Sequence, residues 1–351
     1  MNKRAIDLKG KVAKRIVELH ASGRFRRRRP LNDPTTPADI DIRPASVCGK
    51  ASERLFIAFR TPSCGGSCTM CGFGVEGVES VTYDDLIAQF AVLAGHYDLK
   101  KFSGRLSLCT ESDAFFGVPL SFWEKIAAMV CTTPVREVDM EATPVHAIRH
   151  VDSLRHLQEL FGKARLYIGM GLETHDDYVR NMLLRKNLPI EIFEEAVEKL
   201  AEAGIGVYVY ILLKPPGLNE KEAIEECIRT VRYFFDLAKR LGAARCRVTL
   251  KPLFIPRETI AEALYNEGLI TPPKLWSLIE VIKQTHQLGT LFVPLFDEGL
   301  AVDENHVAHN CSACTPKIRE AMHKFNATQK IEPLLEVSCN CKGDWQTEVG
   351  R

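Results

Sequence analysis

The sequence predicts an α/β fold in which about six parallel βα units form a partial, TIM-like (β/α)6 barrel. Between residues 54 and 295, short apolar runs of strand length alternate with amphipathic stretches of helical length. This alternation is typical of parallel βα units, and continuous apolar runs are typical of strands whose sheet is covered on both faces. A chain of 351 residues can build one such barrel and carry additional segments at its ends.

The predicted strands are the apolar runs Leu55 to Arg60, Arg105 to Cys109, Arg136 to Glu141, Leu166 to Gly171, Gly206 to Leu213 and Arg245 to Leu250. Two of the intervening helices carry start signals, because Thr82 precedes Asp85 and Asn219 precedes Glu222 by three residues. At each start the first side chain can cap the helix while the carboxylate returns a hydrogen bond to the backbone.

Three segments are expected: a basic N-terminal arm over residues 1–45, the barrel core over 46–295 and a small cysteine-rich C-terminal module over 296–351. The formal net charge is only +1, but the first 29 residues hold eleven Lys or Arg against Asp7 and Glu18. A basic arm can attract a nucleic acid by counterion release, although an arginine run such as residues 26–29 is also common on solvated surfaces.

Hydropathy places the chain among ordinary globular proteins. Mean hydropathy is -0.08, with 46% hydrophobic and 26% charged residues, which excludes disordered, collagen-like and coiled-coil classes. The longest strongly apolar stretch, residues 205–213, is too short to cross a bilayer. The first residues lack the apolar region of a secretory signal, so a cytoplasmic location without a membrane partner is expected.

Among the 12 cysteines, Cys64, Cys68 and Cys71 form a C-x3-C-x2-C motif on a glycine-rich loop directly after the first predicted strand. Cytosolic thiols are kept reduced, so clustered cysteines indicate metal binding or redox chemistry rather than disulfides. Three thiolates can hold three corners of a 4Fe-4S cluster and leave one iron open to a non-protein ligand. A zinc loop or unliganded thiols are the alternatives, but zinc needs a fourth ligand and the nearest, Cys48, lies upstream of the strand.

This loop resembles the signature of the radical S-adenosylmethionine (SAM) enzymes. The resemblance implies a radical SAM barrel whose 4Fe-4S cluster binds SAM and, reduced by a flavodoxin or ferredoxin, cleaves it to methionine and a 5'-deoxyadenosyl radical. Met70 matches the apolar position that contacts the adenine in such enzymes, and Phe73 is also expected at the cofactor.

Residues at the carboxyl ends of the predicted strands are expected to line the same site, because ligands of parallel α/β folds bind there. The resemblance implies cofactor-binding roles for a set of such residues: Thr110, Glu111, Asp113, Glu141, Gly171 and Glu173. Glu173 and Lys214 are the expected catalytic residues. For each carboxylate taken singly, a helix cap or a surface charge is the alternative.

A narrower resemblance rests on residues 171–174, 213–224, 272–277, 309–314 and 339–345, which look like the radical SAM subunit of archaeosine synthase, itself similar to the radical SAM core of the elongator catalytic subunit. In that family a partner enzyme attaches lysine to a 7-cyano-7-deazaguanine in the D-arm of tRNA. The radical enzyme then breaks the lysine carbon–nitrogen bond and leaves the formamidine of archaeosine. The resemblance therefore implies a lyase acting on tRNA, with Lys214 or Glu173 positioning the charged groups of the substrate.

Two strand ends depart from that family's pattern, namely Cys109-Thr110-Glu111-Ser112-Asp113 and Glu141-Ala142-Thr143. Two other interpretations therefore stay open. One is a radical SAM enzyme that acts on a small molecule or a peptide, and the other is a non-catalytic iron–sulfur protein that binds RNA.

The second cysteine group, Cys311, Cys314, Cys339 and Cys341, offers four soft ligands at a spacing suited to one tetrahedral metal. A structural zinc is the first interpretation, ahead of an auxiliary iron–sulfur cluster and of unliganded thiols. The histidines beside it, His306 and His309, are expected to be bystanders.

Overall fold

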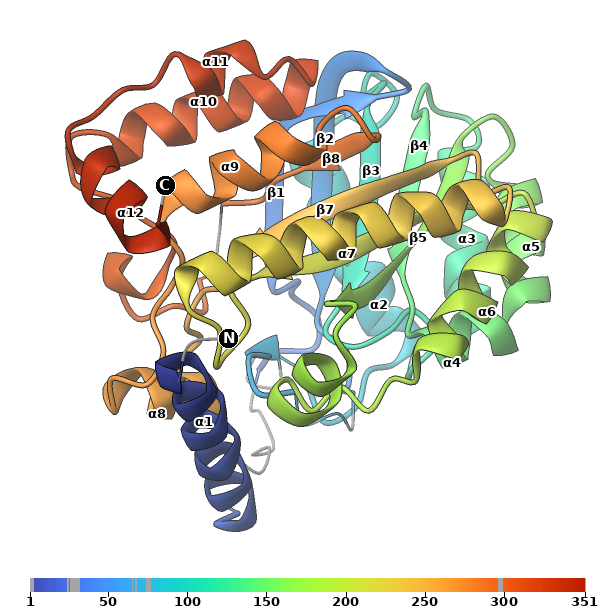
Figure 1. The fold of residues 1–351 in the computed structure, drawn as a ribbon. Helices are drawn as coiled ribbons and strands as arrows, with labels where there is room; N and C mark the ends of the chain where they lie inside the picture. The colour runs from blue at the N-terminus through green and yellow to red at the C-terminus, as the bar shows by residue number, and fades with distance from the viewer. Residues whose placement is uncertain are drawn as a thin grey trace.

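The computed structural model describes residues 3–23, 25, 32–64, 66, 68–73, 77–295 and 299–350. One eight-stranded sheet runs in sequence order from β1 to β8 and curls into a barrel that helices surround (Figure 1). The arginine run at 26–29 lies outside the described residues. No helix in the described ranges is long and apolar enough to span a bilayer.

The strands are β1 (Asp39–Val47), β2 (Lys50–Phe59), β3 (Arg105–Thr110), β4 (Glu137–Glu141), β5 (Arg165–Glu173), β6 (Gly206–Leu213), β7 (Cys246–Pro252) and β8 (Thr290–Phe292). Strands β2 to β8 are mutually parallel, and β1 pairs antiparallel with β2. The six predicted strands correspond to β2 to β7, so the predicted partial barrel is confirmed.

Strands β1 and β8 were not predicted, for two different reasons. β1 contains Pro44 and alternates polar with apolar residues, so its sequence does not read as a parallel core strand. β8 has only three residues, too few to show any period. Both strands owe their existence to pairing with a neighbour in the sheet.

The helices are α1 (Lys3–Ala21), α2 (Tyr83–His96), α3 (Leu120–Val130), α4 (Pro144–Arg149), α5 (Val151–Leu160), η2 (Tyr178–Leu183, a π-helix), α6 (Ile190–Glu202), α7 (Glu220–Arg240), α8 (Ile260–Asn266), α9 (Leu275–Thr285), η3 (Glu304–His306), α10 (Thr315–Thr328), α11 (Glu332–Leu335) and α12 (Cys341–Val349). The capping boxes predicted at Thr82 with Asp85 and at Asn219 with Glu222 are both present.

The first and last strands of the sheet, β1 and β8, meet at what we call the seam of the barrel. Among the described residues, side-chain packing joins them there, and no backbone hydrogen bonds pair the two strands. Phe292 of β8 packs with Ala45 and Val47 of β1. Helix α10 lies over this seam, and the amide of Asn326 both accepts from the backbone N–H of Val293 and donates to its carbonyl, each at 2.9 Å. Asn326 of α10 thereby satisfies the backbone groups of the residue that follows β8.

The segment boundary expected at residue 45 falls within continuous structure. Strand β1 crosses the boundary expected at residue 45. Helix α1 buries Val12 and Ile16 in the main core, and the C-terminal helices contribute Phe325 and Trp345 to that same core. In the described part of the chain, the arm and the C-terminal module therefore pack as extensions of the barrel.

Candidate active site

The cysteine loop follows β2 at the carboxyl end of the barrel and is tied to two other strand ends through Thr69. The backbone N–H of Thr69 donates to Leu184 at 3.0 Å, and its hydroxyl donates to the carbonyl of Leu183 at 2.6 Å. Its own carbonyl accepts from Ala261 at 3.1 Å. Leu183 and Leu184 follow β5 and Ala261 follows β7, so three strand ends converge on the loop.

The thiols of this loop share neighbours in pairs. An ideal Cβ built on Gly66 would lie 3.3 Å from the sulfur of Cys64 and 4.0 Å from that of Cys68. The charge of Lys186 acts on both Cys68 and Cys71. All three cysteines are half-buried. A set of three thiols on one short loop, beside a cation that offsets thiolate charge, fits an iron–sulfur cluster with one iron left open.

Met70 and Phe73 differ in their surroundings. Met70 is half-buried and packs against the main core, whereas Phe73 is 37% exposed. Both side chains lie on the cysteine loop, where the cofactor roles expected for them remain predictions.

Buried hydroxyl groups without a partner lie at the end of β3. Among the described residues, the hydroxyls of Thr110 and Ser112 are buried and have no hydrogen-bond partner. Glu111 beside them is 4% exposed. Because an unsatisfied buried hydroxyl is costly, the two groups fit a polar ligand such as the amino end of SAM.

Asp113 is 1% exposed and is engaged by the protein itself. Its carboxylate accepts from the backbone N–H groups of Phe115 at 2.9 Å and of Thr143, and it lies 3.0 Å from the Nδ1 of His146. In this structure Asp113 therefore joins the end of β3 to the start of α4.

Glu141 faces the interior of the barrel, which we call the lumen. Its Oε1 accepts from the hydroxyls of Tyr210 and Tyr208 and from the thiol of Cys109 at 3.3 Å. Burial, followed by the negative charge of Glu141, raises the pKa of Tyr210 and of Cys109 well above their ordinary values. Both groups therefore stay protonated and can donate to the carboxylate.

Glu173 and Lys214 both adopt left-handed backbone conformations, each with φ of 65°. Such conformations are uncommon for non-glycine residues and cluster at functional sites. Glu173 pairs with Lys186 at 2.9 Å, and Lys214 pairs with Glu220 at 2.6 Å. Each expected catalytic residue therefore already has a charged partner within the protein.

Lys186 has no counterpart among the sequence predictions. Burial opposes its charge, but the carboxylate of Glu173 and the nearby Cys68 and Cys71 outweigh this effect and raise the pKa of Lys186 above its usual range. An ideal Cβ at Gly171 would lie 2.4 Å from its Nζ, so a side chain at this position would displace the ammonium group. The lysine follows a π-helix in a loop, and no sequence period marks such a position.

The second cysteine group converges as predicted. The sulfur of Cys311 lies 3.5 Å from that of Cys314 and 3.4 Å from that of Cys339, and the sulfurs of Cys314 and Cys341 are 3.6 Å apart. All four sulfurs lie within 4.8 Å of one another. The four thiols therefore form a candidate metal site.

One tryptophan supports this metal site, whereas the two nearby histidines contact other groups. The indole N–H of Trp276 donates to the sulfur of Cys341 at 3.4 Å, a contact typical of the groups that support metal ligands. His306 instead contacts Asp303 at 2.9 Å, and His309 contacts the carbonyl of Val307 at 2.8 Å. Both histidines thus have partners outside the four thiols.

Comparison with known proteins finds similarity along nearly the whole chain. The chain is 26% identical over 329 residues to archaeosine synthase subunit beta of Methanosarcina acetivorans, covering 90% of each protein. The protein of the same name from Thermococcus kodakarensis is 23% identical over 86% of this chain and 93% of its own length. The resemblance expected from the sequence is thereby confirmed.

Other comparisons are more distant. No protein-family profile matches the chain. Among solved structures, the Elp3 protein of Methanocaldococcus infernus aligns with a TM-score of 0.48 and 13% identity, covering 70% of this chain and 59% of that one.

Proposed function

We propose that this chain is a radical SAM enzyme that acts on a lysine-modified 7-deazaguanine nucleoside in tRNA. The reaction is cleavage of the lysine carbon–nitrogen bond, which gives archaeosine or a related base. One observation carries this proposal: a C-x3-C-x2-C loop lies at the carboxyl ends of a parallel barrel in a chain similar over 90% of its length to archaeosine synthase subunit beta.

Cys64, Cys68 and Cys71 hold the 4Fe-4S cluster in this proposal. With SAM bound and one electron from a flavodoxin or ferredoxin, such a cluster supplies a 5'-deoxyadenosyl radical for hydrogen abstraction. The buried hydroxyls of Thr110 and Ser112 accept the polar end of SAM, since they have no partner among the described residues.

Glu173 and Lys214 remain the proposed substrate-positioning groups. Glu173 is the stronger candidate, because its partner Lys186 lies beside the cysteine loop. Lys214 instead belongs to a polar chain in which Glu220 accepts from the hydroxyl of Ser277 at 2.6 Å. Lys214 would have to leave Glu220 before it could bind a substrate carboxylate.

We further propose zinc for the C-terminal cysteines. Zinc–sulfur bonds of about 2.3 Å in a tetrahedron separate neighbouring sulfurs by about 3.8 Å. Three of the six sulfur–sulfur spacings are 3.4 to 3.6 Å, and all six lie within 4.8 Å, close to this value. A cubane cluster is larger and would hold its cysteine sulfurs farther apart, so the geometry favours zinc over an auxiliary iron–sulfur cluster.

The proposed macromolecular partners are tRNA and the enzyme that attaches the lysine. Helix α1 packs against η2 and α8, which follow β5 and β7, so it lies at the carboxyl rim of the barrel (Figure 1). Arg15 anchors it to Glu267 at 2.7 Å, while Lys11 and Lys14 are exposed. The exposed ammonium of Lys14 suits contact with a phosphate backbone near the site.

The test is conversion of tRNA by anaerobically purified, iron-reconstituted protein. With SAM, a reductant and tRNA carrying the lysine adduct, we expect 5'-deoxyadenosine and a nucleoside with the mass of archaeosine. Formation of 5'-deoxyadenosine with a small molecule or peptide, but no change in tRNA, would contradict the proposed substrate. Absence of 5'-deoxyadenosine under every condition would contradict the proposed enzyme class.

A further inference from the structure

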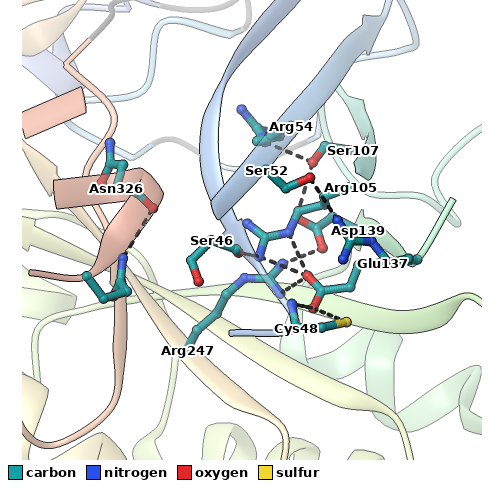
Figure 2. Close-up of polar contacts among 12 residues, drawn as sticks. Ser46, Cys48, Ser52, Arg54, Arg105, Ser107, Glu137, Asp139, Arg247 and Asn326 are labelled. Atoms are coloured by element: carbon teal, nitrogen blue, oxygen red, sulfur yellow. Dashed lines mark hydrogen bonds and ion pairs between the residues drawn. The ribbon is translucent and has the colours of Figure 1, made fainter. Parts of the chain in front are cut away.

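Five charged side chains, which we call the lumen cluster, meet inside the barrel, and each is less than a tenth exposed: Arg54, Arg105, Glu137, Asp139 and Arg247. They come from the four strands β2, β3, β4 and β7. Figure 2 shows Arg105, Arg247, Glu137 and Asp139 in mutual contact and Arg54 beside them, linked to Ser107. Such buried charges are stable only when each one is paired and hydrogen-bonded.

Two of the guanidinium groups account for both carboxylates. Arg105 pairs with Glu137 at 2.8 Å and also donates to the carbonyl of Ser46 at 2.7 Å. Arg247 pairs with Asp139 and lies 3.6 Å from Glu137. A third carboxylate of the lumen, Glu141, accepts from Tyr210, Tyr208 and Cys109. Among the described residues, Arg54 is the cation of the lumen cluster that has no carboxylate within ion-pair distance.

The Nε of Arg54 donates to the hydroxyl of Ser107 at 2.8 Å (Figure 2). Within the described residues, its two Nη nitrogens have neither a hydrogen-bond acceptor nor a carboxylate partner. The residue is only 7% exposed. Because arginine stays charged in proteins, the guanidinium edge of this largely buried residue is a suitable place for an anion.

The side chain of Arg54 leans toward the carboxyl ends of the strands, where the cysteine loop lies. In the register of β2 and β3, Arg54 stands opposite Arg105, yet its hydrogen bond goes to Ser107, two residues farther along. Its charge also acts on Cys109 and Tyr210, the groups that donate to Glu141. The free guanidinium edge therefore faces the part of the lumen between the charged layer and the cysteine loop.

Aromatic rings cover the guanidinium on its faces. The Cζ of Arg54 lies 4.5 Å from the centroid of Phe56 and 5.6 Å from that of Phe292. Rings over the faces leave the planar edge for a partner, and a carboxylate matches that edge with two parallel hydrogen bonds.

We propose that Arg54 binds the carboxylate of the amino-acid group on the substrate, and that it thereby selects a lysine adduct over an amine adduct without a carboxylate. This inference rests on the proposed function. The lysine side chain would extend from the cysteine loop into the lumen and place its carboxylate against the guanidinium edge. Arg54 is then the group that lets the enzyme recognise which amine was attached to the base.

The experiment compares two tRNA substrates, one carrying lysine on the modified base and one carrying 1,5-diaminopentane, which lacks only the carboxylate. For the unmodified protein we expect kcat/KM to be about 10- to 100-fold higher with the lysine adduct, the range of a buried charge-assisted hydrogen bond. Arg54→Met should lower kcat/KM for the lysine adduct to the value for the amine adduct and leave the amine adduct unaffected. Arg54→Lys should restore part of the preference.

The matched control is Arg245→Met, which removes a partly exposed guanidinium near Tyr167 and should keep the full preference. Thermal melting verifies that each variant folds. Equal use of both adducts by the unmodified protein, a preference that survives Arg54→Met, or an equal loss on both adducts would overturn the role of Arg54 while the proposed function stands. Conversion of neither adduct by the unmodified protein would overturn the proposed function and this inference with it.

Discussion

Lys186 and Glu173 form an ion pair directly over Gly171, with 2.9 Å between Nζ and Oε1. The pair joins the end of β5 to the segment after η2 and holds a cation beside Cys68 and Cys71. The charge of the cysteine loop is therefore balanced by a residue more than a hundred positions away in the chain.

Changing this pair should shift the redox potential of the reconstituted cluster in opposite directions. Lys186→Met removes a positive charge and should lower the midpoint potential, whereas Glu173→Gln removes a negative charge and should raise it. Shifts on the order of tens of millivolts correspond to a partly screened charge at this range. A redox titration followed by electron paramagnetic resonance measures them. Lys199→Met, on the exposed face of α6, is the control, and shifts of the same sign in both variants would contradict the expectation.

Replacing a cysteine of the first group should remove the cluster. Cys68→Ala should bind little iron after reconstitution and form no 5'-deoxyadenosine from SAM, because the remaining two thiols cannot hold the cluster. Iron analysis and chromatography of the SAM products provide the measurements. The exposed Cys131 offers the control, since Cys131→Ala should behave like the unmodified protein. Full iron content in Cys68→Ala would refute the assignment of this loop.

Replacing a cysteine of the second group should reduce stability. We expect one zinc per chain by metal analysis, and we expect Cys339→Ala to lose it and to melt at least about 5 °C lower, because a structural zinc contributes directly to folding. SAM cleavage should persist at temperatures where the variant is folded. A variant with an unchanged melting temperature but no turnover would show instead that this metal takes part in the reaction.

The side chain of Asn326, which joins α10 to the residue after β8, should contribute measurably to the free energy of unfolding. Asn326→Ala leaves the N–H and C=O of Val293 without their partner, at a cost of about 2–3 kcal/mol for two buried hydrogen bonds. Urea denaturation of both proteins gives the difference. Lys324→Ala, an exposed change on the same helix, should have little effect. Equal free energies of unfolding for Asn326→Ala and the unmodified protein would show that these two hydrogen bonds do not stabilise the fold.

Acid should weaken the attachment of the segment after β5 to α7 through Glu226. Burial opposes its charge, but hydrogen bonds from Thr174, Arg229 and the backbone of Asp176 outweigh this and hold the pKa of Glu226 below its ordinary value of 4.5. The charged carboxylate is thus favoured in the folded state, so its contribution is complete above pH 4.5 and is lost as the pH falls through the lower folded value.

Unfolding free energies measured between pH 6 and pH 3 should therefore fall less steeply in Glu226→Gln, because its amide does not titrate. The exposed neighbour Glu225 supplies the matched variant, and Glu225→Gln should retain the slope of the unmodified protein. Identical slopes for Glu226→Gln and the unmodified protein would show that Glu226 makes no such contribution.

Local sequence patterns were enough to predict the strands β2 to β7, the two capping boxes and the convergence of the four C-terminal cysteines. Each of these depends on neighbours in the sequence or on a few soft ligands at a suitable spacing. The polar lumen was not predicted, although Glu137, Asp139 and Glu141 alternate along β4 and so point to one face. That alternation was a usable signal, since a strand covered by apolar groups on both faces would not repeat charges at every second position.

From its amino acids alone, this protein is a barrel of parallel strands with a three-thiol loop at one end and a four-thiol group near its C-terminus. Only the folded chain shows that Lys186 lies beside that loop, that Phe292 packs across the seam onto β1, and that Arg54 is the cation of the lumen cluster without a carboxylate partner. The physical reason is that closure of the barrel turns the inner faces of distant strands toward one another. Which charges are paired there depends on contacts between strands, and a period along one strand does not contain that information.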